Sequence, residues 1–387
     1  MKNKIILCFV DYYLPGYKAG GPIRSIANLV EHLGNEFEFR IICKDRDMLD
    51  IKSYANVNID TWNAVGKAKV YYASKKTLTF KGIKKILDET EYDLLYLNSF
   101  FSYKFTIIPL SLIKMRLVQK KPCIIAPRGN FAIEAFKLKR VKKKIYLELA
   151  KYLNLYQGLN WQASSHYEKK DIIRELSGTA QQIFVAPDLT AFMADNNCNF
   201  KLRSPGSLRL LFLSRISPMK NLDFLLKVLT EVIVSVELSI FGPIEDLIYW
   251  KKCLKLIDKL PSNIKIIIGD EVPYKEVVNI FKKHDLFVLP TRGENFGHII
   301  IESLSTGLPT LISDKTPWQS NHGDGLKIIS LDKNKWVLFI NNFSKLDDKS
   351  LIKTRSDAVN YALNYNMKDS PVTKNKDFFN FVLKIGK

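Results

Sequence analysis

Short apolar runs alternate with amphipathic stretches along most of this 387-residue chain. The apolar runs are too short for helices and suit buried parallel strands. We expect strands at Ile5–Val10, Glu38–Cys43, Val70–Ala73, Leu94–Asn98, Cys123–Ala126, Leu208–Leu213, Ser239–Pro243, Ile264–Ile268, Asp285–Pro290 and Pro309–Asp314. Between them, apolar residues recur at helical spacing, as in Ile23–Leu33 and Leu222–Leu229. This alternation predicts an α/β fold with parallel sheets.

The expected strands fall into two series of similar size. Ile183–Pro187 closes the first series, and the segment Asp195–Ser207 that follows is polar and rich in turn-forming residues. Such a segment is typical of a linker. We therefore expect one α/β domain at 1–195, a second at 205–365, and a helical end at 366–387.

The composition is that of a globular protein, with 47% hydrophobic and 12% aromatic residues. No apolar run reaches the length of about 18 residues that a membrane-spanning helix needs. The apolar start of the chain ends at Asp11 and suits a first strand better than a signal peptide. Five scattered cysteines fit a reducing compartment and form no zinc motif. These features predict a cytoplasmic protein.

The net charge of +20 is concentrated in the stretch Lys137–Lys151. Its apolar residues recur at the spacing of a helix that packs on a core, and we expect them to face inward: Leu138, Val141, Ile145 and Leu149. The cations on its flank have three interpretations: a solvated face, a surface for anionic membrane or lipid phosphate, or a nucleic-acid site. We place nucleic acid last because no nucleic-acid-binding motif accompanies the charge.

The most informative stretch runs from Pro290 to Glu302 and reads as strand, glycine loop and helix. Gly293 and Gly297 interrupt the pattern, and apolar residues at helical spacing follow until Gly307. The first backbone N–H groups of such a helix can hold an anion, for example a diphosphate.

Two carboxylates stand out in this stretch. Glu294 lies in the loop, where open sheets place their ligands. Glu302 lies eight residues later in an otherwise apolar helix. Burial of a carboxylate is costly without partners, so Glu302 faces either hydroxyls or a cation, or else it points to solvent.

A second strand-to-helix loop carries Arg215 and Lys220. A guanidinium and an ammonium on the two sides of such a loop can hold a diphosphate, although a surface loop with ordinary charges is the alternative.

The sequence Glu294-Asn-Phe-Gly-His298, followed by an apolar run and Glu302, resembles the retaining glycosyltransferases of the group 1 family. Tyr12-Tyr13 and Gly20-Gly21-Pro22 resemble the N-terminal signature of that family. The resemblance implies the GT-B architecture, with two Rossmann-like α/β/α domains facing a deep cleft. It also implies that the C-terminal helix, within 366–387, crosses back to the first domain.

The resemblance assigns roles to particular residues. Glu294 would lie at the sugar, Glu302 would hold the ribose, and Arg215 and Lys220 would hold the donor phosphates. The remaining expected donor contacts are Asn295, Phe296, Gly297, His298 and Gly242, and the expected acceptor or cleft residues are Gly20, Gly21, Arg128 and Gly129. The chain lacks the histidine that many relatives carry near Arg128, which puts that sugar contact in doubt.

Three features have two interpretations each. Asp45-Arg46-Asp47 matches a metal-binding motif of another glycosyltransferase class, but we interpret it as a loop feature and expect no metal or other cofactor. Ser165 and Glu168 form either a family motif or a helix capping box, and we favour the cap. Trp318 either shields the cleft or belongs to the core.

The sequence therefore predicts a retaining, metal-independent glycosyltransferase that uses a nucleoside-diphosphate sugar. The expected acceptor is a saccharide, lipid-linked at the inner face of the cell membrane, in capsule, O-antigen or lipopolysaccharide synthesis. An anionic membrane surface is a further expected partner, and nucleic acid is not. The alternative is a catalytically silent GT-B protein that binds nucleotide sugar or scaffolds an assembly; an epimerase or a phosphorylase is a weaker one.

Overall fold

The computed structural model describes residues 3–133, 136, 140–176, 180, 182–191, 206–320, 323–367 and 370–385. The chain divides into two compact units, one made of Met1–Leu189 with Asp369–Lys387 and the other of Thr190–Lys368. The expected domain limits at 195 and 205, most of the expected linker and Leu138 lie outside the described residues.

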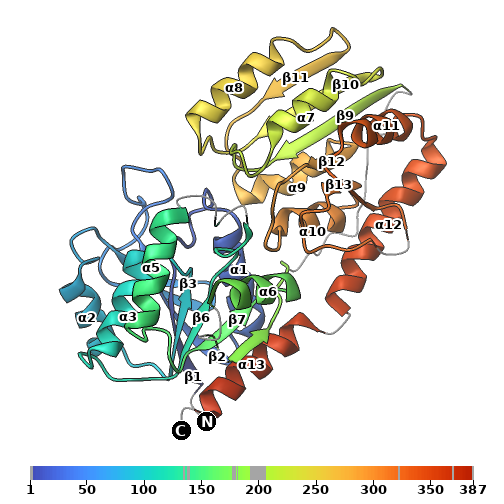
Figure 1. The fold of residues 1–387 in the computed structure, drawn as a ribbon. Helices are drawn as coiled ribbons and strands as arrows, with labels where there is room; N and C mark the ends of the chain where they lie inside the picture. The colour runs from blue at the N-terminus through green and yellow to red at the C-terminus, as the bar shows by residue number, and fades with distance from the viewer. Residues whose placement is uncertain are drawn as a thin grey trace. The chain divides into compact units, whose positions relative to one another are not determined.

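The first unit is built on an eight-stranded sheet of order β3-β4-β2-β1-β5-β6-β7-β8 (Figure 1). The strands are β1 (Lys4–Phe9), β2 (Phe37–Lys44), β3 (Trp62–Val65), β4 (Ala68–Ala73), β5 (Leu94–Asn98), β6 (Cys123–Ala126), β7 (Asn160–Ala163) and β8 (Gln182–Val185). Every pair is parallel except β3 with β4. The edge strand β3 has no apolar run and was not expected.

Helices cover both faces of this sheet. They are α1 (Gly21–Leu33), α2 (Phe80–Glu89), η1 (Tyr103–Ile107), α3 (Ile108–Lys114), α5 (Arg140–Tyr152), α6 (His166–Leu176) and α13 (Pro371–Ile385). Along β1, Ile5 and Leu7 enter the core beneath α2, α3, α5 and α6, whereas Ile6 and Cys8 enter the core beneath α1 and α13. Burial on both faces explains why the parallel strands are continuously apolar.

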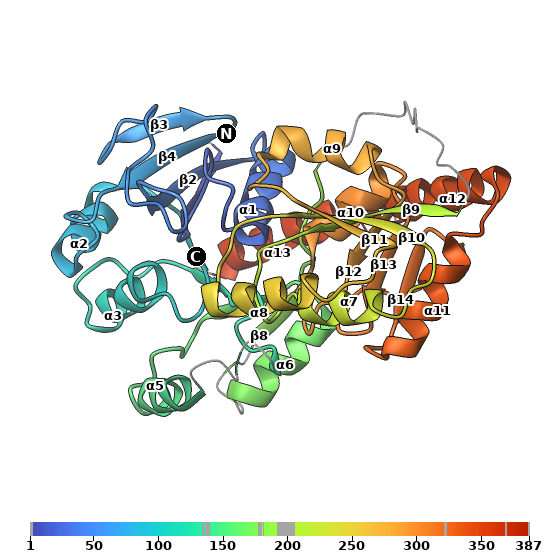
Figure 2. The same cartoon turned by 90° about the horizontal axis from the view of Figure 1, so that it is seen from above.

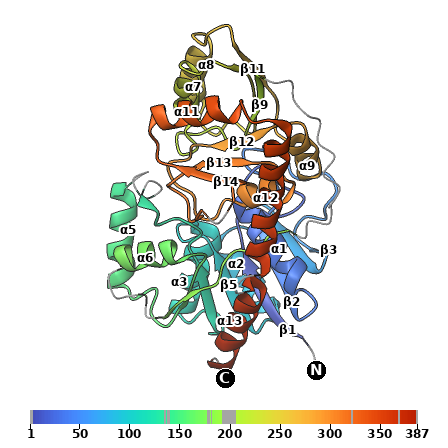
Figure 3. The ribbon, with the colours of Figure 1, turned by 90° about the vertical axis from the view of Figure 1, so that its right-hand side faces the viewer.

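The C-terminal helix α13 packs on the first unit, as expected (Figure 3). The ring of Phe379 lies 5.7 Å from that of Phe37 and 5.5 Å from that of Tyr96. The side chain of Asn375 donates a hydrogen bond of 2.7 Å to the carbonyl of Pro187. Aromatic packing against β2 and β5, and this hydrogen bond to the segment after β8, therefore fix the last helix to the first unit.

The second unit has a six-stranded parallel sheet of order β11-β10-β9-β12-β13-β14. Its strands are β9 (Ser207–Leu213), β10 (Ser235–Phe241), β11 (Ile264–Ile268), β12 (Leu286–Leu289), β13 (Thr310–Ser313) and β14 (Leu326–Ile329). Its helices are α7 (Leu222–Leu229), α8 (Leu247–Ile257), α9 (Tyr274–Lys282), α10 (His298–Ser305), α11 (Lys333–Phe343) and α12 (Asp348–Met367). Helix α7 packs with α8 and α11, and α10 packs with α9 and α12.

Strand order reverses once in each sheet. In the second unit β9 lies between β10 and β12, and in the first unit β1 lies between β2 and β5. Open α/β sheets bind ligands beyond the carboxyl ends of the strands at such a reversal. The structure therefore directs attention to the loops after β1, β5, β9 and β12.

One packing expectation is wrong. Val141, Ile145 and Leu149 of α5 are 71%, 64% and 54% exposed, and the helix instead buries Leu147 and Ala150. The aromatic cluster beneath α5, which contains Phe100 and Phe101, receives Tyr146 from the opposite side of the helix. Helix α5 thus carries two apolar stripes, and only the shorter one reaches the core. Among the described residues, no helix is both long and apolar enough to cross a membrane.

Candidate active site

Two loops of the second unit meet at the reversal between β9 and β12. The side chain of Asn221 donates to the carbonyl of Pro290 at 2.9 Å, and the backbone N–H of Arg292 donates to the carbonyl of Met219 at 2.8 Å. Nε of Arg292 also donates to Oδ1 of Asn221 at 2.9 Å. Asn221 adopts a left-handed conformation at the start of α7. The loop that carries Lys220 is therefore fastened to the loop that carries Glu294.

An ion pair joins the two expected catalytic groups Lys220 and Glu294. Their side chains are only 11% and 15% exposed. They lie 74 residues apart in the sequence, and adjacent strands bring them together. The backbone N–H of Glu294 also donates to the carbonyl of Lys315 at 3.0 Å, so both the side chain and the backbone of this residue are held.

Arg215 forms a different pair. Its Nη1 atom lies 3.0 Å from Oε1 of Glu245, and both side chains are about one-third exposed. Glu245 follows β10 and was not expected from the sequence, because nothing in its local pattern distinguishes it from a surface glutamate. Gly242 lets this loop approach β9: its φ is +132°, and a Cβ atom there would lie 2.1 Å from the carbonyl oxygen of Ser214.

The glycine loop ends at Gly297, the N-cap residue directly before α10, as the sequence indicated. Gly297 has a φ of +81°, and a Cβ atom there would lie 2.8 Å from Cγ of Glu294 and from Cδ1 of Ile300. Glu302, on α10, is 5% exposed. The solvent-facing alternative for Glu302 is therefore wrong.

Trp318 supports the loop from beneath. Its indole N–H donates to the carbonyl of Phe296, and the two rings lie 5.1 Å apart. The ring of Phe296 in turn lies 4.7 Å from that of His298. Trp318 is buried in the core of the unit, so the core interpretation of this residue is correct. Asn295 lies in the same loop, between Glu294 and Phe296.

In the first unit, α1 begins at Gly21 after Gly20. Gly20 has a φ of +67°, and no atom lies within 4 Å of the position that its Cβ would occupy. The backbone conformation, rather than crowding, therefore requires glycine here.

Arg128 and Gly129 are engaged within the first unit. The guanidinium of Arg128 is buried against Asp188 and donates to Oδ1 of Asn98 at 3.1 Å. Burial acts to lower the pKa of Arg128, but the combined attraction of Asp188, Tyr96 and Glu168 outweighs it and raises that pKa. The backbone N–H of Gly129 donates to Glu168 at 2.6 Å. Both residues therefore hold this loop to the rest of the first unit, and their role toward an acceptor stays a prediction.

Glu168 also receives hydrogen bonds from the backbone and hydroxyl of Ser164 at 2.7 and 2.8 Å. Burial raises the pKa of this carboxyl, although these bonds act in the opposite direction. Ser165 caps α6 by accepting from the N–H of Glu168 at 3.1 Å, which confirms the favoured cap. In a full capping box, the carboxylate of Glu168 would accept from the backbone N–H of Ser165. It instead accepts from the N–H groups of Ser164 and of Gly129, in the loop after β6.

The aspartates of the Asp45-Arg46-Asp47 segment are also engaged locally. Asp45 pairs with Arg46 at 2.8 Å, and Asp47 accepts from the backbone N–H groups of Tyr17 and Lys18 at 2.7 and 3.1 Å. These contacts support the interpretation as a loop feature, because the carboxylate of Asp47 anchors the loop that leads to Gly20.

A pocket of about 480 Å³ lies at the carboxyl ends of β1, β2, β5 and β6. It is lined by Asp11, Lys44, Ser99, Phe101, Ser102, Tyr103, Lys104, Asn130 and Lys143. Nζ of Lys44 pairs with Asp11 at 2.7 Å and lies 4.1 Å from the ring centre of Tyr12. Ser99 has a φ of +113°, which is strained for a residue other than glycine and is common at binding sites. The sequence predicted none of these residues as part of a site, although Lys143 falls within the basic stretch Lys137–Lys151.

Comparisons with known proteins agree with this geometry. Residues 196–362 match the family model of the glycosyl transferases group 1. The chain is 26% identical over 362 residues to the UDP-Gal:alpha-D-GlcNAc-diphosphoundecaprenol alpha-1,3-galactosyltransferase of Escherichia coli, with 84% of each chain covered. It is 23% identical over 313 residues to an uncharacterized 41.2 kDa protein in the cps region of Klebsiella pneumoniae, which covers 79% of this chain and 81% of that protein.

A solved structure shares the fold. The crystal structure of Anabaena HepE in complex with UDP and glucose matches with a TM-score of 0.70 at 14% identity, covering 98% of this chain and 99% of that one. The chain therefore has the GT-B fold of the glycosyltransferases. More narrowly, the family model of the glycosyl transferases group 1 matches residues 196–362, which make up most of its second unit.

We expect Gly297→Ala to destabilise the second unit by about 1–2 kcal/mol, because alanine disfavours a positive φ and its Cβ would crowd Glu294. Gly293→Ala is the matched control: the nearest atom to its Cβ would be Sδ of Met219, at 3.4 Å. Denaturant unfolding followed by tryptophan fluorescence measures both. Equal stability of the two variants would contradict the assigned loop geometry.

Proposed function

We propose that this protein is a retaining glycosyltransferase that moves a sugar from a nucleoside-diphosphate sugar to a saccharide acceptor. The observation that carries the proposal is the Lys220–Glu294 ion pair, which holds two loops together at the strand reversal of a group 1 unit. The names of the two relatives, one a UDP-Gal-dependent galactosyltransferase and the other a protein of a cps region, support a role in surface polysaccharide synthesis.

In the proposed reaction the donor's diphosphate lies against Lys220, Arg215 and the first turn of α10. These groups stabilise the negative charge that builds up as the sugar leaves. Lys220 exchanges its carboxylate partner for phosphate, and Glu294 is then directed to the sugar. Glu302, on the same helix as His298, holds the ribose hydroxyls. The protein cations supply the charge that a metal supplies elsewhere, so the proposed transfer needs no metal or cofactor.

Retention follows if the acceptor attacks the face that the diphosphate leaves. The bond between the anomeric carbon and the phosphate oxygen breaks, and a bond from that carbon to the acceptor oxygen forms. The acceptor's proton passes to the departing phosphate oxygen, so every atom is accounted for without a protein base. Glu294 stabilises the positive character of the sugar ring between these events.

We assign the acceptor to the pocket of the first unit. Two aromatic side chains, Phe101 and Tyr103, can stack on a sugar ring, and Lys44 and Lys104 can bind phosphate. Among the described residues Lys104 forms no ion pair. This combination fits a saccharide on a lipid diphosphate, the kind of acceptor that the E. coli relative is named for. We therefore place the reaction on the cytoplasmic side of a membrane, with the protein bound peripherally.

In the presence of EDTA, one of the nucleoside diphosphates UDP, GDP and ADP, or its sugar, should raise the thermal midpoint, whereas the monophosphate CMP and its sugar should not. A ligand at 100 times its Kd adds about 2.7 kcal/mol to the folded state. Glu302→Gln should abolish this shift, whereas Glu237→Gln, on an exposed pair with Lys265, should keep it. A shift that requires added metal, or no shift with any of the nucleoside diphosphates, would count against the proposed donor site.

Arg215→Ala should lower kcat by about 10²–10³-fold, the usual loss when one donor to a developing anion is removed. Glu245→Ala breaks the same ion pair but should change kcat less than about threefold, because it leaves Arg215 in place. The product of the wild type should keep the donor's anomeric configuration by NMR. Equal losses in the two variants would mean that Arg215 acts only as a structural partner, and an inverted product would refute retention.

Lys104→Ala should raise the KM for an acceptor that carries a diphosphate by about tenfold, because a charge-assisted hydrogen bond contributes about 1.5–3 kcal/mol. The same saccharide without the diphosphate should show no change. Lys114→Ala serves as the control, because Lys114 is the last residue of α3 and does not line this pocket. An equal rise in KM for both acceptors would contradict the assignment of Lys104 to the acceptor's phosphate.

A further inference from the structure

Helix α5 presents an apolar stripe to solvent. Val141, Ile145, Leu149 and Tyr152 are 71%, 64%, 54% and 84% exposed. At 3.6 residues per turn these four positions fall within an arc of roughly 80°. Single exposed apolar residues are ordinary, but an aligned set of four marks a contact surface. Figure 2 shows α5 at the outer edge of the first unit.

Cations flank the stripe on both sides. Around the helix axis, Lys142 lies next to the edge of the stripe at Leu149, and Lys144 lies beyond the opposite edge at Val141. Both lysines are exposed. Arg140 and Lys151 extend the second flank, where Lys151 pairs with the helix's one acidic residue, Glu148, at 3.2 Å. The helix therefore carries five cations and one carboxylate. Lys143 points the other way, with Nζ 5.0 Å from the ring of Phe101.

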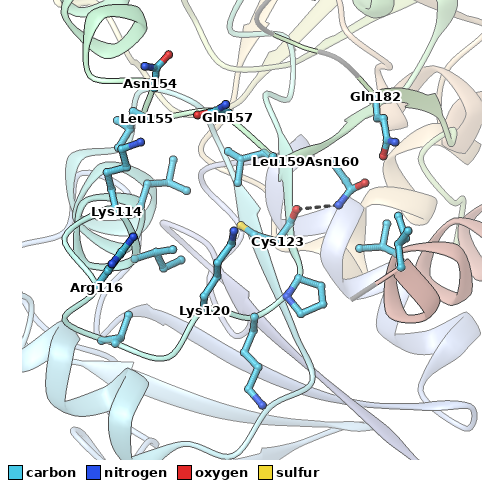
Figure 4. A pocket seen from close by; sticks show the side chains of 18 residues that line it. Lys114, Arg116, Lys120, Cys123, Asn154, Leu155, Gln157, Leu159, Asn160 and Gln182 are labelled. Carbon is cyan, nitrogen blue, oxygen red and sulfur yellow. Dashed lines mark hydrogen bonds between the residues drawn. The ribbon is translucent and has the colours of Figure 1, made fainter. Parts of the chain in front are cut away.

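The surface continues beyond the end of α5. A hollow of about 1050 Å³ is lined jointly by Asn154 and Leu155, which follow the helix, and by the turn after α3 (Figure 4). Its basic lining residues are Lys114, Arg116, Lys120 and Lys121, and none of the described residues that line it is acidic. Met115 and Leu117 in the same turn are exposed apolar residues. Apolar and cationic side chains thus recur together next to the stripe.

We propose that the exposed stripe of α5 is the docking surface of this protein for an anionic lipid bilayer. A helix with an apolar face and lysine-rich flanks lies in the plane of a membrane interface, with its apolar side chains among the acyl chains and its cations at the headgroups. Tyr152 suits the interface because its ring is apolar and its hydroxyl is polar. The occupant is anionic lipid rather than a neutral partner, because the helix carries five cations against the single carboxylate of Glu148.

The proposal concerns attachment and does not depend on the transfer reaction. Because the stripe is exposed in the folded unit, replacing it does not disturb the core. The tests therefore use the full chain and measure vesicle binding by flotation, with nucleotide binding as a separate readout. Loss of nucleotide binding in the wild type would affect the proposed function only.

We expect the wild type to float with vesicles of 70% phosphatidylcholine and 30% phosphatidylglycerol and to remain unbound with phosphatidylcholine alone. Ile145→Asp with Leu149→Asp should lower binding by at least tenfold, with an unchanged thermal midpoint. Ile233→Asp with Ile248→Asp, at positions 77% and 85% exposed in the second unit, should bind as the wild type does. Removing Lys142 or Lys144 should lower binding about fivefold for each lysine.

Three outcomes would overturn the proposal: equal binding to neutral and anionic vesicles, flotation unaffected by the α5 substitutions, or no flotation at all. If the wild type were instead a dimer that Ile145→Asp dissociates, the stripe would belong to a second copy of the chain. Binding of the α5 region to nucleic acid without flotation would likewise contradict a lipid surface.

Discussion

The adjacency of β9 and β12 is the constraint on which the active site depends. It brings Lys220 and Glu294 into one ion pair, although 74 residues separate them in the sequence. Taking two charges so largely out of water costs desolvation energy that their attraction recovers only in part. The pair is therefore weak support for stability, but it keeps a cation and a carboxylate at fixed places before a substrate arrives. In the proposed reaction, a diphosphate takes the place of that carboxylate on Lys220.

The fixed positions of Lys220 and Glu294 depend on contacts outside their ion pair. Asn221 and Arg292 fasten the two loops to each other, Trp318 supports the backbone at Phe296, and Gly242 permits close approach to Ser214. Asp223 stiffens the start of α7: burial disfavours its charge, but hydrogen bonds from Lys252 and Tyr249 prevail and hold the pKa of this carboxyl below its usual range. Rigid loops with fixed charges are what electrostatic stabilisation of a leaving group requires.

The sequence predicted the local units well, because strand, glycine loop and helix are encoded by adjacent residues. The start of α10 directly after Gly297 and the burial of Glu302 are examples. Partners from other strands could not be predicted. The Arg215–Glu245 pair and the lining of the proposed acceptor pocket, which includes Lys44 and Lys104, come together only through strand order. Arg128 had the right position after β6, but the sequence did not reveal that Asp188 engages it.

Helix α5 shows a different limit, because its sequence contains two apolar stripes and periodicity cannot choose between them. Leu147 and Ala150 are buried beside Tyr146, which packs against the aromatic cluster. The longer stripe, which includes Ile145 and Leu149, is exposed to solvent. The orientation of α5 that buries Leu147 also places its three consecutive lysines in different surroundings. Lys143 turns inward to the pocket, where Phe101 lies beneath it, while Lys142 and Lys144 turn to solvent beside the exposed stripe. Successive side chains of a helix point about 100° apart around its axis. Neighbouring lysines of one basic run can therefore serve different sites, here the proposed phosphate-binding pocket and the proposed membrane surface.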